Sequence, residues 1–277
     1  VGLLAPGTAA AARPSAVAAA RVLLVGTFKG HRGGFATVQA AVDAARPGDW
    51  ILVAPGDYHE VADAHATADA ISHGDFGGVY IDKPGLHLRG MNRNTVVLDG
   101  TNSGSGRCSA DAAAQNFGPA GSDGRPGGRN GILVWNADRV SVENLTVCNF
   151  LGGAGAAGNG IWWNGGDGTG RIGLTGYTGR YLTATSTYYA PKTAAQYGIF
   201  ASNAAGPGTW TTVYASNMAD SGMYVGACLR SCAATITDAW MQYSALGYSG
   251  TNSGGSIVIQ RSEFDHNKDG VHTNTQL

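Results

Sequence analysis

A pair consisting of glycine and a following apolar residue recurs through the second half of the chain. From Gly198 onward, successive pairs are 24, 25 and 23 residues apart, and the earlier intervals of 29 and 38 residues require loops inserted into the repeat. A recurring period of about 20 to 50 residues is typical of solenoids, in which each repeat stacks on its neighbours. The pairs are Gly131-Ile132, Gly160-Ile161, Gly198-Ile199, Gly222-Met223, Gly247-Tyr248 and Gly270-Val271.

Further strand-like runs lie between these pairs, namely VSVENLTV, TTVYAS, ATITDAW and SIVIQRSEF. One turn of the coil, here called a rung, is therefore expected to hold two or three short strands joined by turns rich in Gly, Asn and Ser, which suit turn backbone. Because parallel strand connections are overwhelmingly right-handed, the sequence predicts an all-β protein: a right-handed, single-stranded parallel β-helix.

A helix is expected near the start of the coil. In FATVQAAVDAAR (residues 35–46), Phe35, Val38 and Val42 lie on one helical face, Thr37 suits the N-cap, and Pro47-Gly48 ends the helix. The runs WILVAP, GVYIDKPGLHLRG and TVVLDG follow as strands. A helix over 37–46 is therefore predicted to cap the N-terminal end of the solenoid, where an open strand edge would recruit other chains.

Composition narrows the class of protein. The 44 glycines have no three-residue period, which excludes collagen, and 43% hydrophobic residues are enough to form a core. A formal net charge of −1 gives no general attraction to nucleic acid or to an anionic membrane. We therefore expect neither as a partner.

The small apolar residues that open the chain resemble the end of a secretory signal peptide. The sequence VGLLAPGTAAAARPSAVAAA offers Ala-x-Ala sites before Arg13 and near Ala20, although the positively charged start is missing. We expect residues 1–30 to be a signal-peptide remnant or a disordered leader, and residues 31–277 to form the β-helix domain. No uncharged apolar run reaches the ~18 residues that a bilayer requires, so a secreted protein is expected.

Four cysteines agree with an oxidising compartment. Cys228 and Cys232 flank a short loop and are predicted to form a disulfide; a metal site is the alternative, but no second Cys or His pair with zinc spacing is present. Cys108 and Cys148 are left as the other pair.

These segments resemble a known superfamily. The opening FATVQAAVDAARPGDWILVAPGDYHE and the repeats GIFASN, SGMYVG and SEFDHNKDGVHTNT are similar to secreted bacterial β-helix proteins of the pectate-lyase-like superfamily. The resemblance runs from about residue 35 to the end and implies the fold. It leaves activity open, because this superfamily includes lyases, hydrolases, esterases, epimerases and proteins that only bind.

The chain stops on a repeat strand, in DGVHTNTQL, without a closing helix. This predicts a solenoid that is truncated or processed at Leu277, or one whose next rungs come from a partner. The alternative is a short tail that simply ends there.

Alternation along the strands predicts a stripe on one outer face. If the residue after each marker glycine points inward, the next one points outward, and rungs ~4.8 Å apart stack these positions. Exposed aromatic rings bind sugar faces, so Trp162, Phe200 and Tyr224 are the expected substrate-binding residues. The alternative is that the loops at 152–159, 164–180 and 185–196 cover the stripe. Its members are Leu133, Trp162, Phe200, Tyr224, Ser249 and His272.

Two aspartates beside the stripe are the candidate acid and base. The segment NKDG resembles the Asn-x-Asp-Gly of polygalacturonases, a resemblance that implies an acid or base role for Asp269; their remaining motifs do not follow. Asp220 is expected at the same edge two rungs earlier, roughly 10 Å away, which leaves room for a water as in inverting glycosidases. Two solvated turn aspartates are the alternative.

Elimination needs a different set of groups, a base and a cation that stabilises the anion. Lys268, His272 and Arg230 are the nearby candidates, against the alternative that they are ordinary surface groups. No cofactor is expected. Calcium is only weakly indicated, because Asp265 and Asp269 lack a third carboxylate and the fragment GGDGTG occurs once.

Two functions therefore stay open. The first is an enzyme that cleaves glycosidic bonds of an extracellular plant, algal or microbial polysaccharide, as a lyase or a hydrolase. The second is a non-catalytic solenoid that binds a glycan or a protein and assembles through its C-terminal end.

Overall fold

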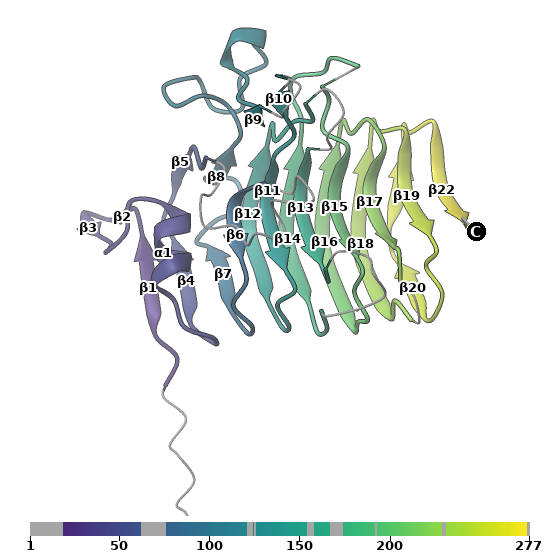
Figure 1. Cartoon of the computed structure of the whole chain (residues 1–277), viewed down its shortest axis with the longest axis horizontal. Coiled ribbons are helices and arrows are strands. Elements are labelled where there is room, and N and C mark those ends of the chain that lie inside the picture. The colour runs from purple at the N-terminus through teal and green to yellow at the C-terminus, as the bar shows by residue number, and fades with distance from the viewer. Residues whose placement is uncertain are drawn as a thin grey trace, which may run out of the picture.

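The computed structural model is a parallel β-helix, as predicted (Figure 1). It describes residues 19–61, 76–120, 124, 126–153, 158–166, 174–191, 193–228 and 231–275. One long parallel sheet carries the marker glycines. Its seven strands are β6 (Gly77–Ile81), β11 (Asn130–Trp135), β13 (Asn159–Asn164), β15 (Tyr197–Ser202), β17 (Ser221–Gly226), β19 (Leu246–Thr251) and β22 (Asp269–Asn274).

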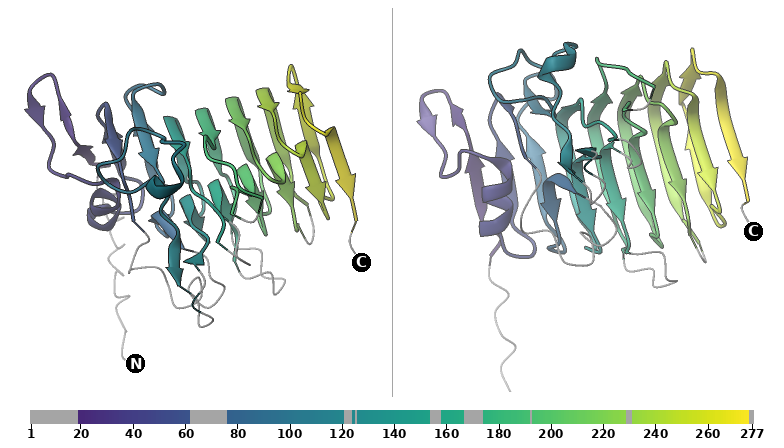
Figure 2. Two further views of the ribbon diagram at one scale, coloured as in Figure 1. Left: turned by 90° about the horizontal axis from the view of Figure 1, so that it is seen from above. Right: turned by 45° about the horizontal axis from the view of Figure 1, so that its top comes forward.

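The second sheet has eleven strands and forms the rest of each rung (Figure 2). The strands are β1 (Val22–Val25), β4 (Trp50–Val53), β5 (Gly56–Tyr58), β7 (His87–Gly90), β8 (Val96–Asp99), β12 (Ser141–Cys148), β14 (Thr178–Thr185), β16 (Gly208–Ser216), β18 (Ala234–Gln242), β20 (Ile257–Gln260) and β21 (Glu263–Asp265). The middle rungs have one long strand each, from β12 to β18, whereas earlier rungs and the last one hold pairs of short strands.

A column of residues in left-handed backbone bends each rung of the second sheet. Their φ angles lie between 49° and 58°, a region that non-glycine residues rarely occupy. The strand register aligns them on successive rungs. The column is Asn144, Tyr181, Thr212, Asp238 and Arg261.

Each rung therefore presents three outer faces. Face 1 is the outer surface of the seven-stranded sheet. Face 2 and face 3 are the outer surfaces of the second sheet before and after the bend.

The glycine repeat has a packing cause. A Cβ on Gly160 would lie 2.4 Å from the carbonyl oxygen of Gly198, and a Cβ on Gly198 would lie 2.6 Å from that of Gly222. Such contacts are too short for any side chain, so the rungs stack this closely only with glycine. The apolar residues that follow point into the core and are buried: Ile132, Ile161, Ile199, Met223 and Tyr248.

The predicted helix forms as α1 (Val38–Ala44), with Thr37 as its N-cap. Glu60 accepts hydrogen bonds from the backbone N–H groups of Val38 at 2.6 Å and Gln39 at 3.3 Å. A carboxylate at the start of a helix accepts hydrogen bonds from N–H groups that have no partner within the helix. Its negative charge also interacts favourably with the positive end of the helix dipole. The helix contacts β1, β4 and β6. Its role as an end cap and the right hand of the coil stay predictions.

The coil begins earlier than the sequence suggests. Strand β1 pairs with β4 through Val22 to Val25, inside the range 1–30 assigned to a leader. Alternating burial of Leu23 and Val25 anchors β1 to the core, a pattern too short to stand out beside the alanine-rich start. Residues 1–18 lie outside the described residues, so the signal-peptide prediction stays a prediction.

Short elements decorate the rungs. The pair β2 (Thr27–Phe28) and β3 (His31–Arg32) is antiparallel, as is the pair β9 (Gly118–Ala120) and β10 (Pro126–Gly127). A 3-10 turn, η1 (Ala112–Ala114), lies in the loop after β8. Within the described part of the chain, no helix has the length and apolar character to cross a bilayer.

Both predicted disulfides are present. The Cα atoms of Cys228 and Cys232 lie 5.4 Å apart, and those of Cys108 and Cys148 lie 5.8 Å apart, within the usual range. The second bond fastens the long loop after β8 to the end of β12.

Candidate functional site

The predicted stripe on face 1 is in register. Leu133 pairs with Trp162, Trp162 with Phe200, and Phe200 with Tyr224. The alignment continues through Ser249 to His272. It also extends by one rung at the start, where Tyr80 pairs with Leu133.

The stripe is open to solvent at only some of its positions. Tyr80, Leu133, Phe200 and Ser249 are buried, Trp162 and Tyr224 are half-buried, and His272 is exposed. The stripe is therefore covered at its first two positions. A ligand on face 1 would reach the half-buried rings of Trp162 and Tyr224, which mark an opening in the stripe, and the exposed His272.

The rings next to this opening form a packed group. Trp162 stacks on Phe200 with ring centroids 4.7 Å apart. Tyr197 lies 5.0 Å from Phe200 and 5.2 Å from Tyr224. Because these rings hold one another, Tyr224 presents a fixed ring at the edge of the opening.

Asp220 lies directly beside these rings. Its Oδ2 accepts a hydrogen bond from the Tyr197 hydroxyl at 3.4 Å, and its Oδ1 accepts one from the Ser221 hydroxyl at 2.5 Å. The Ser249 hydroxyl lies 2.9 Å from that of Ser221. Asp220 is thus oriented by groups from its own rung and from the rung before it.

Burial raises the pKa of Tyr197, and the negative charge of Asp220 raises it further. Burial also raises the pKa of Tyr224. Both phenols therefore keep their protons at neutral pH. Tyr197 therefore donates a hydrogen bond to Asp220 and does not give up its proton.

Asp269 and His272 form a second pair at the last described rung. His272 Nδ1 lies 3.2 Å from Asp269 Oδ2, and both side chains are about half exposed. The register aligns Asp269 with Leu246 and Ser221, one position after Asp220. No hydrogen bond or ion pair of the described residues joins Asp269 to Asp220.

Lys268 opens onto a pocket of about 390 Å³ at the corner between face 3 and face 1. Tyr189, Tyr243 and His266 line it as well. Among the described residues, Lys268 has no ion-pair partner. Arg230, the other predicted cation, lies outside the described residues.

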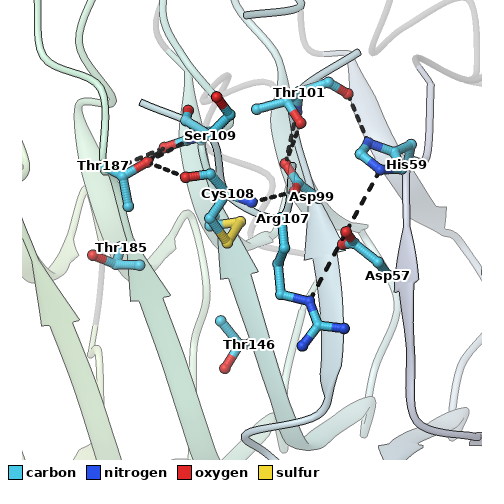
Figure 3. Close-up of a disulfide and its surroundings, with 12 residues drawn as sticks. Asp57, His59, Asp99, Thr101, Arg107, Cys108, Ser109, Thr146, Thr185 and Thr187 are labelled. Atoms are coloured by element: carbon cyan, nitrogen blue, oxygen red, sulfur yellow. Dashed lines mark hydrogen bonds and ion pairs between the residues drawn. A yellow bond between two sulfur atoms is a disulfide. The ribbon is translucent and has the colours of Figure 1, made fainter. Parts of the chain in front are cut away.

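A second cluster of ionisable residues lies at the N-terminal end of face 3 (Figure 3). Strand β5 provides Asp57 and is followed by His59, and β8 ends at Asp99. Arg107 approaches from the loop that the Cys108–Cys148 disulfide holds. His59 Nε2 and Arg107 Nε lie 3.7 Å and 3.9 Å from Asp57 Oδ2.

Protons in this cluster are constrained by its hydrogen bonds. His59 Nδ1 lies 3.0 Å from the carbonyl oxygen of Thr101. Because a carbonyl oxygen only accepts, Nδ1 carries a proton, and Nε2 is the ring nitrogen that faces Asp57. Burial raises the pKa of Asp57, and the charge of Asp99 raises it further. Asp57 Oδ1 is buried without a hydrogen-bond partner among the described residues.

Three residues of this cluster are close enough to share a cation. One ligand atom each from Asp57, His59 and Asp99 lie within 4.8 Å of one another. However, both oxygens of Asp99 already accept hydrogen bonds, from Thr101 and from the backbone N–H of Cys108. Arg107 adds a positive charge, so the set does not match the many free oxygens that calcium prefers.

The residues named for calcium in the sequence are also engaged elsewhere. Asp265 bonds Trp240, Gln242 and His266, whereas Asp269 bonds His272. A calcium site stays a prediction.

Sequence reasoning missed the Asp57 cluster because its members come from two strands and a long loop. Only the segment GDYHE, which contains Asp57 and His59, gives a local signal. The pairing of β5 with β8 lies before Gly131-Ile132, the first of the glycine pairs that mark the period.

The stacked parallel rungs define the fold of this chain as a parallel β-helix. The structure is similar to pectate lyase Pel9A, with a TM-score of 0.53 and 15% identity over 90% of this chain and 54% of that one. It is also similar to a rhamnogalacturonan lyase, with a TM-score of 0.51 and 11% identity over 86% of this chain and 65% of the other. At such identities the likeness concerns the fold.

The chain thus spans little more than half of Pel9A and just under two thirds of the rhamnogalacturonan lyase. No protein-family model matches the sequence, and no curated protein matches it significantly.

Proposed function

We propose that this protein is a secreted, polysaccharide-active β-helix that cleaves glycosidic bonds of a plant, algal or microbial polysaccharide. The observation that carries the proposal is the Asp220 carboxylate, oriented by Tyr197 and Ser221 beside the fixed ring of Tyr224. A carboxylate next to a ring that can stack on a sugar supplies one of the two carboxyl groups that acid–base cleavage of a glycan uses.

In this proposal Asp220 accepts a proton and Tyr224 stacks on a sugar ring. Tyr197 keeps its proton and orients the carboxylate. Asp269, paired with His272, is the second acid or base, two rungs or roughly 10 Å further along. This spacing is compatible with a water between the two groups and too long for a retaining pair.

Elimination would use the same surface differently. Asp220 would take the proton beside a uronate carboxyl, the bond to the leaving oxygen would break, and an acid would protonate that oxygen. Lys268 or His272 would offset the charge on the carboxyl. The names of the two similar structures, both lyases, support this version without deciding it.

Secretion is supported by the two disulfides, which persist in oxidising compartments.

A non-catalytic solenoid that binds a glycan or a protein is the second candidate. The half-buried rings of Trp162, Tyr197 and Tyr224 favour it, because such rings can bind a sugar whether or not a carboxylate reacts.

The test uses the purified protein and a panel of neutral and acidic polysaccharides. Absorbance of unsaturated products reports elimination, and new reducing ends report either kind of cleavage. Cleavage that Asp220→Asn abolishes supports the proposal. Binding without cleavage on every polymer would favour the second candidate, and cleavage unchanged in Asp220→Asn would overturn the site.

A further inference from the structure

The C-terminal end of face 3 carries a hydrogen-bonded aromatic group that the proposed cleavage site does not use. Asp265 is at its centre. Its Oδ1 accepts a hydrogen bond from Trp240 Nε1 at 3.1 Å, and its Oδ2 accepts one from Gln242 Nε2 at 3.0 Å. His266 Nδ1 lies 2.8 Å from the same Oδ2. One carboxylate therefore fixes an indole and an imidazole.

Further rings extend this group on both sides. Tyr214 meets Trp240 edge to face with centroids 6.3 Å apart, and its hydroxyl lies 3.3 Å from Gln242 Oε1. On the other side, Tyr243 lies 5.1 Å from the His266 ring. We name Tyr214, Trp240, Tyr243 and His266, together with Tyr189, the face 3 aromatic patch.

The patch is open to solvent. The exposed fractions of Trp240, Tyr243 and Tyr189 are 48%, 55% and 61%. Tyr189, Tyr243 and His266 line the pocket of about 390 Å³ at the corner with face 1, a volume in the range of small-ligand sites. Large rings are rarely left exposed next to one another without a ligand.

We propose that the face 3 aromatic patch is a binding site for a neutral polysaccharide chain, separate from the cleavage site on face 1. Flat exposed rings match the apolar faces of sugars, and the polar groups between them can bond hydroxyls. Their orientation is set before binding, which lowers the entropy that a flexible side chain would lose.

The charges of the patch select against acidic polymers. Glu263 lies in the same column as Trp240 and Tyr214, and it has no ion-pair partner among the described residues. Asp265, two residues further along, is the second carboxylate of this surface, and Lys268 in the adjoining pocket is a single cation beside the two. A uronate polymer would therefore be repelled across this surface, whereas a neutral chain would not.

The site goes beyond the proposed cleavage and does not depend on it. Trp240 belongs to the second sheet and Asp220 precedes a strand of the first. A chain bound at Trp240 would leave face 1 free for another segment.

The test is titration calorimetry of the intact protein with cellohexaose, xylohexaose and mannohexaose, and with hexagalacturonate as the acidic probe. Trp240 is the one exposed tryptophan of the described residues, so its fluorescence reports binding independently. We expect at least one neutral hexaose to bind. Trp240→Ala and Tyr243→Ala should each weaken that binding at least fivefold, in line with the loss of about 1 kcal/mol for an aromatic contact.

Tyr181→Ala is the matched control, because this tyrosine is 51% exposed and lies at the bend away from the patch. It should leave affinity within twofold, as should Asp220→Asn, which separates this site from the cleavage site. Absence of neutral binding, undiminished binding in Trp240→Ala, or binding of hexagalacturonate alone would overturn the proposal. So would self-association of the protein that Trp240→Ala abolishes, since a second copy would then be the occupant.

Discussion

The hydroxyl of Tyr197 donates a hydrogen bond to Oδ2 of Asp220 across two neighbouring rungs, over 3.4 Å and 23 residues of sequence. The rung stack itself creates this contact, because the register brings the start of β15 beside the start of β17. It gives the proposed site a carboxylate whose orientation is set by a hydroxyl from the neighbouring rung.

Replacement of Asp220 should remove most of the activity. On a polysaccharide that the protein cleaves, Asp220→Asn should lower kcat by at least ~100-fold, since general acid–base catalysis contributes about 10²- to 10⁴-fold. Tyr197→Phe, which keeps the ring and removes the hydroxyl, should have a smaller effect of about tenfold. Asp238→Asn, at an exposed ion pair with Arg261, is the control and should leave the rate unchanged.

Asp269 and Tyr224 should separate by kinetic effect. If Asp269 is the second acid or base, Asp269→Asn should lower kcat by at least ~100-fold. Tyr224→Ala should chiefly raise KM, because stacking stabilises the bound ground state and the transition state about equally. Steady-state kinetics of both variants on one substrate distinguish the roles. Full activity of Asp269→Asn would leave the NKDG segment as a turn only.

The two disulfides should differ in their contribution to stability. The Cys108–Cys148 bond closes 40 residues and the Cys228–Cys232 bond closes 4. Chain-entropy reasoning gives about 4 kcal/mol for the longer loop and about 2 kcal/mol for the shorter. Urea unfolding of the two double Cys→Ser variants measures this order. Equal losses would show that the long loop after β8 is held by other contacts.

Acid should destabilise the first rungs through Asp49. Hydrogen bonds from the Arg21 side chain are the main cause of the lowered pKa of Asp49, which falls from 3.8 to about 2. Burial acts in the opposite direction, and hydrogen bonds from backbone N–H groups lower the pKa further. A lowered folded-state pKa contributes stability above pH ~4 that is lost as the pH falls toward 2.

Arg21→Gln should therefore reduce stability at pH 5 more than at pH 2, as measured by unfolding at the two pH values. Arg261→Gln breaks an analogous but exposed pair with Asp238 and should change stability little. Equal losses of stability in the two variants would contradict the proposed role of the Arg21–Asp49 pair.

Asp57 should behave in the opposite way. Burial and the nearby charge of Asp99 raise its pKa, so ionised Asp57 opposes folding. The stability that protonated Asp57 contributes is fully present below its unfolded-state pKa near 3.8. This stability is lost as the pH rises through the higher folded-state pKa. Asp57→Asn should therefore raise the unfolding temperature at pH 7 but not at pH 3. A decrease at pH 7 would show that the charge is needed, as in an occupied cation site.

The repeat made face 1 predictable from sequence alone. Each marker glycine fixes both the register and the direction of the next residues, so the stripe from Leu133 to His272 follows from counting. Tyr80 was missed although Gly78-Val79 carries the same signal, because a long insertion separates it from Gly131. Which stripe residues are covered depends on loops that have no period.

Contacts away from the marker strands were harder to predict. Trp240 and Asp265 are 25 residues apart, which is about one rung. The side chains of Trp240 and Asp265 can be placed only when the position of the bend, at Asp238 and Arg261, is known. The offset of one residue between Asp220 and Asp269, in contrast, follows from counting, because Asp220 precedes Gly222 by two residues and Asp269 precedes Gly270 by one.

The left-handed column has a consequence for how such a protein can grow. Its positions hold an asparagine, a tyrosine, a threonine, an aspartate and an arginine, so the bend is imposed by the neighbouring rungs and not by the residue. A duplicated segment of 23 to 25 residues would inherit its corner from the copy on which it stacks. Lengthening by tandem duplication therefore needs no new turn sequence, and each added copy would extend all three faces in alignment.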